Sequence, residues 1–105
     1  MLIVVGNAKV VARQRDRMMR ACEAMVTASR LEEGCAGYNY AFDILEPEMM
    51  RVIELWRDEA ALRFHFRTPH MAAFLGELAA MGSRPDIVVY EAGNPHPISG
   101  YAPGR

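Results

Sequence analysis

The chain has 105 residues, which is enough for one small domain with a single hydrophobic core and too few for two ordinary domains. Twelve Lys and Arg residues oppose 13 Asp and Glu residues, and the formal net charge of −1 excludes an overall electrostatic field that would recruit nucleic acid or anionic lipid. Hydrophobic residues make up 51% of the chain, so we expect a second buried surface besides the domain core.

The cysteines and the first residues indicate a reduced, cytoplasmic setting. Cys22 and Cys35 have no metal-ligand spacing, and one pair is too few for a disulfide framework. The opening "MLIVV" is interrupted by Gly6 and Lys9 and is too short for a signal core or a membrane span. It is typical of a buried strand.

The hydrophobic pattern of the first half predicts a strand, a helix and a hairpin. Residues 2 to 11 are short and β-branched, which favours a strand. Residues 14 to 32 carry an apolar stripe at helical spacing, and "EEGC" ends that helix. Residues 38 to 43 alternate aromatic and polar side chains, and the turn "LEPE" separates them from a second strand, 49 to 56.

The second half predicts two helical pieces and a last strand. The first piece opens at Asp58, and "RTP" forms a joint at which Thr68 can cap a new helix with Pro69 in its first position. That helix continues to Gly82, and "PDIVVYEA" is the final strand. The order β-α-β-β-α-β predicts an α+β, ferredoxin-like fold, in which a four-stranded antiparallel sheet carries its helices on one face.

The other face of the sheet predicts a homodimer. Residues 1 to 92 form the expected domain, and residues 93 to 105 form a tail rich in Pro and Gly. The strands are apolar on both faces, so the face without helices must be buried, most economically against a second copy of the chain.

Polar residues within apolar strands are the candidate substrate contacts. If Ile53 and Leu55 face the helices, Glu54 and Trp56 point into a chamber between the sheet and its partner. A carboxylate in such a chamber must be paired or neutralised, which makes Glu54 a candidate site residue. The alternatives are that Glu54 pairs with a flanking arginine and that Trp56 belongs to the core.

Asn7, Tyr38 and Tyr40 are further candidates for substrate binding. Asn7 lies among apolar residues and could donate to a substrate oxygen, or it could bond the backbone beside Gly6. The two tyrosines share a strand face and could offer phenol groups, although aromatic residues on strands often belong to the core.

The segment "HFRTPH" holds two of the three histidines, His65 and His70. His65 lies on the apolar stripe of its helix and, as a neutral enclosed imidazole, could act as a general base; the alternative is a histidine held by backbone or by a carboxylate. His70 is expected to cap or pack locally. Pro69 separates the two residues, so we do not predict a metal site from this pair.

The motifs "GCAGY", "EPE", "ELWRDEAAL" and "HFRTPHMAAF" resemble, in order and spacing, the antibiotic biosynthesis monooxygenase family, including its quinol monooxygenases. The resemblance covers about residues 2 to 92 and implies a dimeric α/β barrel with facing sheets. It also implies oxygenation of a phenolic or anthrone-like ring by O₂ without metal, flavin or haem. Haem degradation, found in a related branch, is not expected because Leu75 stands about where that branch has its haem-ligating histidine.

The sequence therefore predicts a small cytoplasmic homodimer that performs cofactor-independent oxygenation of a hydroxylated aromatic substrate. His65 is the expected base, and Asn7, Trp56, Glu54, Tyr38 and Tyr40 are the expected substrate-binding residues. No metal, nucleic acid or membrane partner is expected. Two alternatives share this fold: an isomerase that uses the same base without O₂, and a ligand-binding or structural dimer whose chamber is filled by side chains.

Overall fold

The computed structural model describes residues 1–104, and these form one antiparallel sheet covered by helices. The strands are β1 (Leu2–Lys9), β2 (Cys35–Phe42), β3 (Met49–Trp56) and β4 (Asp86–Glu91), and they lie in the order β2-β3-β1-β4. Each neighbouring pair runs antiparallel. The predicted four-stranded sheet is confirmed.

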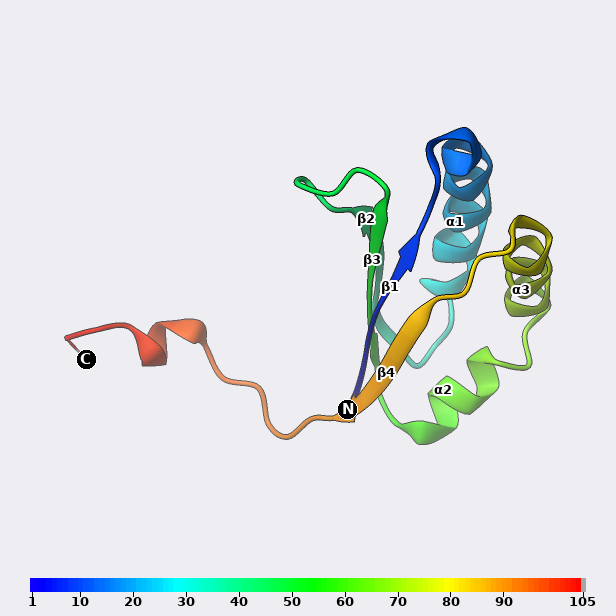
Figure 1. Cartoon of the computed structure of the whole chain (residues 1–105). Coiled ribbons are helices and arrows are strands. Elements are labelled where there is room, and N and C mark those ends of the chain that lie inside the picture. Colours follow the sequence, from blue (N-terminus) through cyan, green and yellow to red (C-terminus); the bar gives the residue numbers. More distant parts are fainter. Residues whose placement is uncertain (105) are drawn as a thin grey trace.

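Three α-helices pack on one face of this sheet (Figure 1). They are α1 (Arg15–Ser29), preceded by a short 3₁₀ turn, α2 (Glu59–His65) and α3 (Pro69–Met81). The element order is that of the ferredoxin-like fold, with its second helical region divided into two helices. The predicted joint at "RTP" is the connection between α2 and α3.

The helix ends follow from local chemistry. The Asp58 carboxylate accepts the Ala61 N–H at 2.8 Å at the start of α2, and the Thr68 hydroxyl accepts the Met71 N–H at 3.2 Å at the start of α3. α3 ends at Gly82, whose φ of 66° lies in the left-handed region that favours glycine. These caps fix where α2 and α3 begin, and thus the helical turns that carry the two histidines.

α1 is shorter than the sequence predicts, because it ends at Ser29 rather than at residue 32. The chain turns there, and the Arg30 side chain donates from Nε to the carbonyl oxygen of Tyr38 at 3.0 Å. Glu32 consequently lies in a turn, not on the helix surface. This early turn directs its side chain into the protein, where only 6% of it is exposed.

The expected orientation of β3 is wrong. Glu54 and Trp56 face the helices and are 5% and 0% exposed, whereas Ile53 points to the face without helices and is 46% exposed. In the register Tyr38 and Val4 lie opposite Glu54, on the strands at either side of it. Because side chains alternate along a strand, one wrong choice of face reverses every residue of the element. The candidate pocket therefore lies inside the protomer, between sheet and helices.

After β4 the described chain contains one short 3₁₀ turn, Ile98–Tyr101. This segment leaves the sheet on the side opposite the helices and extends away from it (Figure 1). Within residues 1–104, no helix is both long and apolar enough to cross a membrane.

Candidate active site

A cavity of about 380 Å³ lies between the sheet and the pair α2 and α3. Apolar side chains form most of its wall, among them Phe74 and Leu78 from α3 and Ile87 and Val89 from β4. The polar residues of the lining are Tyr38, Tyr40, Glu54 and His65. A cavity of this size and composition is typical of a small-molecule site in which a few polar groups orient an apolar ligand.

Glu54 is held by Trp56 beneath the cavity. The indole Nε1 donates to Glu54 Oε1 at 2.9 Å, and both side chains are buried. Burial raises the pKa of Glu54 above its usual range, and the Trp56 N–H opposes part of that rise. The flanking arginines do not neutralise it: Arg51 pairs with Asp43 and Glu46, and Arg57 pairs with Glu33 and Asp58.

Trp56 itself is fully enclosed and does not line the cavity. Its ring centre lies 4.6 Å from that of His65 and 6.1 Å from that of Tyr38. The tryptophan therefore positions residues of the cavity wall, and any effect of Trp56 on a ligand passes through Glu54, His65 and Tyr38.

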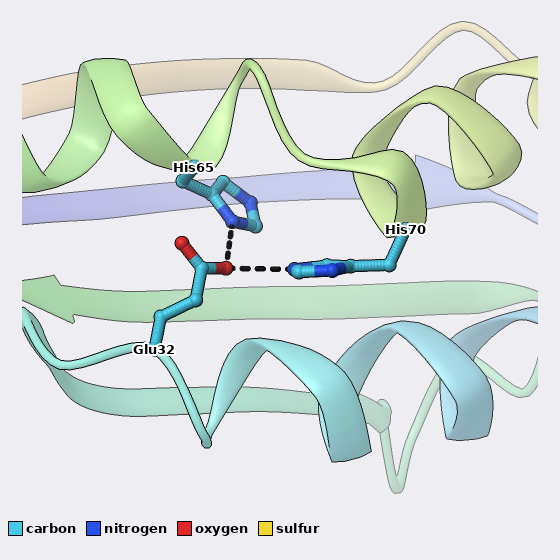
Figure 2. Close-up of side chains that lie close together, drawn as sticks. All are labelled: Glu32, His65 and His70. Atoms are coloured by element: carbon cyan, nitrogen blue, oxygen red, sulfur yellow. Dashed lines mark hydrogen bonds and ion pairs between the residues drawn. The ribbon is translucent and has the colours of Figure 1, made fainter.

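His65 is almost completely buried, with 1% exposed, and is paired with a residue that the sequence did not single out. Its Nδ1 lies 2.6 Å from Oε2 of Glu32 (Figure 2). A carboxylate can only accept a hydrogen bond, so this contact places the imidazole proton on Nδ1 and leaves the lone pair on Nε2. Nε2 lies 3.5 Å from the hydroxyl of Tyr38, at the cavity wall.

Tyr38 and Tyr40 share one face of β2, as predicted, and this face lines the cavity between sheet and helices. Their hydroxyls lie 2.7 Å apart, and burial raises the pKa of each phenol well above its usual range. Both phenols consequently keep their protons at neutral pH. One hydroxyl donates to the other, and the pair extends from His65 along the cavity wall.

Asn7 is separated from these residues. β1 turns its side chain to the face without helices, where it lines a hollow with Asn39, Arg51 and Asp86. The sequence did not predict which face of the sheet carries Asn7, and the structure places its side chain across the sheet from His65. Asn7 and the His65 cavity do not form one site within the protomer.

Glu32 and His70 were missed as site residues. His70 was expected to cap or pack locally, but Thr68 provides the cap, and Nε2 of His70 lies 2.7 Å from the same oxygen of Glu32 (Figure 2). No local signal reveals this arrangement, because 33 and 38 residues separate the partners. The early end of α1 is what brings Glu32 to the histidines.

Comparison with known proteins agrees with the observed fold. The family described as antibiotic biosynthesis monooxygenase matches residues 1–77, and the chain belongs to this family. A crystal structure titled as an antibiotic biosynthesis monooxygenase from Deinococcus radiodurans superposes with a TM-score of 0.88 at 24% identity, and covers 93% of this chain and 98% of that one. At that identity the likeness establishes the fold.

Two relatives carry names that refer to an activity. The chain is 32% identical to "Putative monooxygenase YcnE" of Bacillus subtilis, over 85% of this chain and 94% of that protein. It is 30% identical to "Probable quinol monooxygenase YgiN" of Escherichia coli, over 70% and 81%. A third relative, the uncharacterized protein sll1783 of Synechocystis, is 30% identical, and the chain spans 62% of its length. Membership of the family and these names support a monooxygenase-type role.

Proposed function

We propose that this protein is a homodimeric monooxygenase that uses O₂ to oxidise a hydroxylated aromatic compound of the quinol or anthrone type, without a metal or organic cofactor. The observation that carries the proposal is the pairing of His65 with Glu32 at the wall of an apolar cavity. This pairing leaves a basic imidazole nitrogen beside the place where an aromatic ring fits.

In the proposed reaction, Nε2 of His65 removes a proton from the substrate, and Glu32 stabilises the imidazolium that forms. The electron-rich anion then transfers an electron to O₂, and the two radicals combine to a peroxide. For an anthrone, loss of water from this peroxide converts the ring CH₂ to a carbonyl. One oxygen atom enters the product and the other leaves as water, so the balance needs no added reductant.

The surrounding residues support this chemistry in different ways. The Tyr38 and Tyr40 hydroxyls both remain protonated and are hydrogen-bonded to each other, so one of them donates within the pair and the other can donate to the developing oxyanion. Phe74, Leu78 and the other apolar residues of the wall hold the ring and exclude water. Glu54, held by Trp56, supplies a further polar group at the cavity.

The homodimer is proposed from the apolar face of the sheet. Val5, Ile53 and Val88 lie on the face without helices and are each between 39% and 48% exposed. Facing sheets from two copies would cover these side chains and would also enclose Asn7. Asn7 is therefore proposed to contact the partner copy rather than the substrate in its own protomer, and residues 93 to 105 remain a proposed tail outside the domain.

Isotopically labelled O₂ tests the proposed reaction. Protein treated with a chelator is incubated with an anthrone and labelled O₂, and the product mass shows whether one labelled oxygen atom has entered. The same incubation with His65→Gln measures the background reaction. Incorporation that depends on the wild-type protein supports a monooxygenase, whereas an isomerised product without label would support the alternative reaction at the same base.

A further inference from the structure

Glu32, His65 and His70 bring three potential metal ligands from three separate segments to one point (Figure 2). Their ligand atoms all lie within 4.8 Å of one another, and both histidine nitrogens contact the same carboxylate oxygen. We propose that this cluster binds a divalent transition-metal ion of the Zn²⁺ type, and that the ion inhibits His65 when it binds.

The convergence arises from the break between two helices. Two histidines five positions apart do not share one face of a continuous α-helix. His65 lies in the last turn of α2 and His70 in the first turn of α3. Because the chain turns between the two helices, both rings point toward Glu32 in the connection between α1 and β2. Two imidazoles and one carboxylate form a donor set that suits Zn²⁺, whereas Mg²⁺ and Ca²⁺ prefer oxygen ligands.

The second oxygen of Glu32 supports the same assignment. The Glu32 side chain is only 6% exposed, and its Oε1 is buried without a hydrogen-bond partner among residues 1–104. No lysine or arginine of that part of the chain forms an ion pair with it. A buried carboxylate oxygen without a partner is costly, and a cation bound by both oxygens of Glu32 would provide the missing interaction.

Only small movements would be needed for coordination. The carboxylate oxygen now lies 2.6 and 2.7 Å from the two nitrogens, which are hydrogen-bond distances. Ligand atoms placed tetrahedrally about 2.1 Å from Zn²⁺ lie about 3.4 Å from each other. The side chain of His70 is 22% exposed, so it can move outward, and its exposed side provides an entry path and space for water as a fourth ligand.

Coordination would change the tautomer of His65. Without metal, Nδ1 carries the proton that is donated to Glu32, and Nε2 is free to accept a proton. An ion on Nδ1 forces the ring proton to Nε2, where it faces Tyr38. His65 can then no longer accept a proton from substrate. This inhibitory effect rests on the proposed function, whereas the binding of the ion does not.

Binding is tested directly with Zn²⁺ and Co²⁺ after removal of adventitious metal with a chelator. Calorimetry gives the Zn²⁺ stoichiometry and affinity, and the visible absorption of Co²⁺ distinguishes a four- or five-coordinate protein site from the hydrated ion. The variant is His70→Gln, which keeps an N–H donor for Glu32 but has no imidazole. The matched control is His96→Gln, which changes the histidine outside the cluster.

The expected result is one Zn²⁺ per chain for the wild type and for His96→Gln, and an affinity lower by about tenfold or more for His70→Gln. Nitrogen NMR of histidine-labelled wild type provides a test that depends on no variant, because Nδ1 of His65 and Nε2 of His70 should shift on addition of Zn²⁺. Absence of saturable binding by the wild type, equal affinity in His70→Gln, or unchanged resonances would overturn the site.

The two proposals can fail separately. Zinc binding is measured without turnover, so a chain that binds Zn²⁺ but consumes no O₂ would refute the monooxygenase and leave the metal site intact. Inhibition of O₂ uptake by Zn²⁺ in the wild type, with weaker inhibition in His70→Gln at the same Zn²⁺ concentration, is the result expected when both hold. Zinc that occupies the site without slowing uptake would overturn the inhibitory role.

Discussion

The Nδ1 atom of His65 lies 2.6 Å from Oε2 of Glu32, although 33 residues separate the two in the chain. This contact orients the imidazole ring of the candidate site. It places the ring proton on Nδ1 and leaves Nε2, without a proton, facing Tyr38 and the cavity. The role of each neighbouring residue depends on that orientation.

Glu32→Gln should lower kcat by about a hundredfold or more while leaving KM little changed, because the amide has no charge to stabilise the imidazolium. Steady-state O₂ uptake as a function of substrate concentration measures both constants, and the pH dependence of kcat is recorded for both proteins. Glu23→Gln, at an exposed position of α1, is the matched control. Equal kcat values and pH profiles in wild type and Glu32→Gln would show that Glu32 is only structural.

Glu54→Gln should stabilise the fold at neutral pH by about 1 kcal/mol, because burial disfavours the charged carboxylate and the Gln oxygen can still accept the Trp56 N–H. The pKa of Glu54 is raised in the folded state, so the folded protein binds the proton more tightly than the unfolded chain does. Its contribution to stability is therefore present at pH values below the unfolded pKa, and is lost as the pH rises through the folded pKa. Urea unfolding of wild type and variant at a series of pH values measures the difference in their free energies of unfolding, which should vanish in acid. A variant that is less stable than wild type at neutral pH would show that burial of Glu54 does not disfavour its charged form.

Gly34→Ala should destabilise the protein by about 1–3 kcal/mol, because the added methyl group would clash with the Cβ of Ala61 in α2. α2 carries His65, so activity should fall together with stability. Gly76→Ala, inside α3 with open space around the new methyl group, should instead stabilise by about 0.5–1 kcal/mol. Thermal and urea unfolding compare the two substitutions, and equal effects would show that the contact between Gly34 and α2 is not tight.

Ile53→Asp should convert the proposed dimer to a monomer, because it places a charge at the centre of the apolar face without helices. Sedimentation velocity at micromolar protein concentration measures the mass of each species. Leu31→Asp introduces the same charge at an exposed apolar position in the α1–β2 connection and should leave the dimer intact. A monomeric wild type, or a dimer in both variants, would contradict the facing-sheet arrangement.

The order of elements could be predicted from sequence because each element carries local information. Thr68 and Pro69 mark the start of α3, Gly82 marks its end, and the alternation of Tyr38 and Tyr40 marks a strand face. Such signals depend on residues a few positions apart. They are present in the chain before any tertiary contact forms.

The orientation of β3 could not be predicted in the same way. Ile53 and Leu55 alternate with Val52, Glu54 and Trp56, so neither set is clearly polar, and the assumption that Ile53 and Leu55 face the helices placed Glu54 on the wrong face. The Trp56 N–H that makes burial of Glu54 tolerable is a tertiary detail. Glu32 was missed for a related reason, since its partners are distant in sequence and "EEGC" carries a stronger signal as a helix end.

Oxygen consumption by chelator-treated protein is the most direct test of cofactor-free oxygenation with His65 as the base. Wild type and His65→Gln are compared against anthrones and quinols, with catalase present to reveal peroxide. Uptake by the wild type should survive chelation, and it should fall by about a hundredfold or more in His65→Gln. No protein-dependent uptake, or equal uptake by both proteins, would contradict cofactor-free oxygenation with His65 as the base.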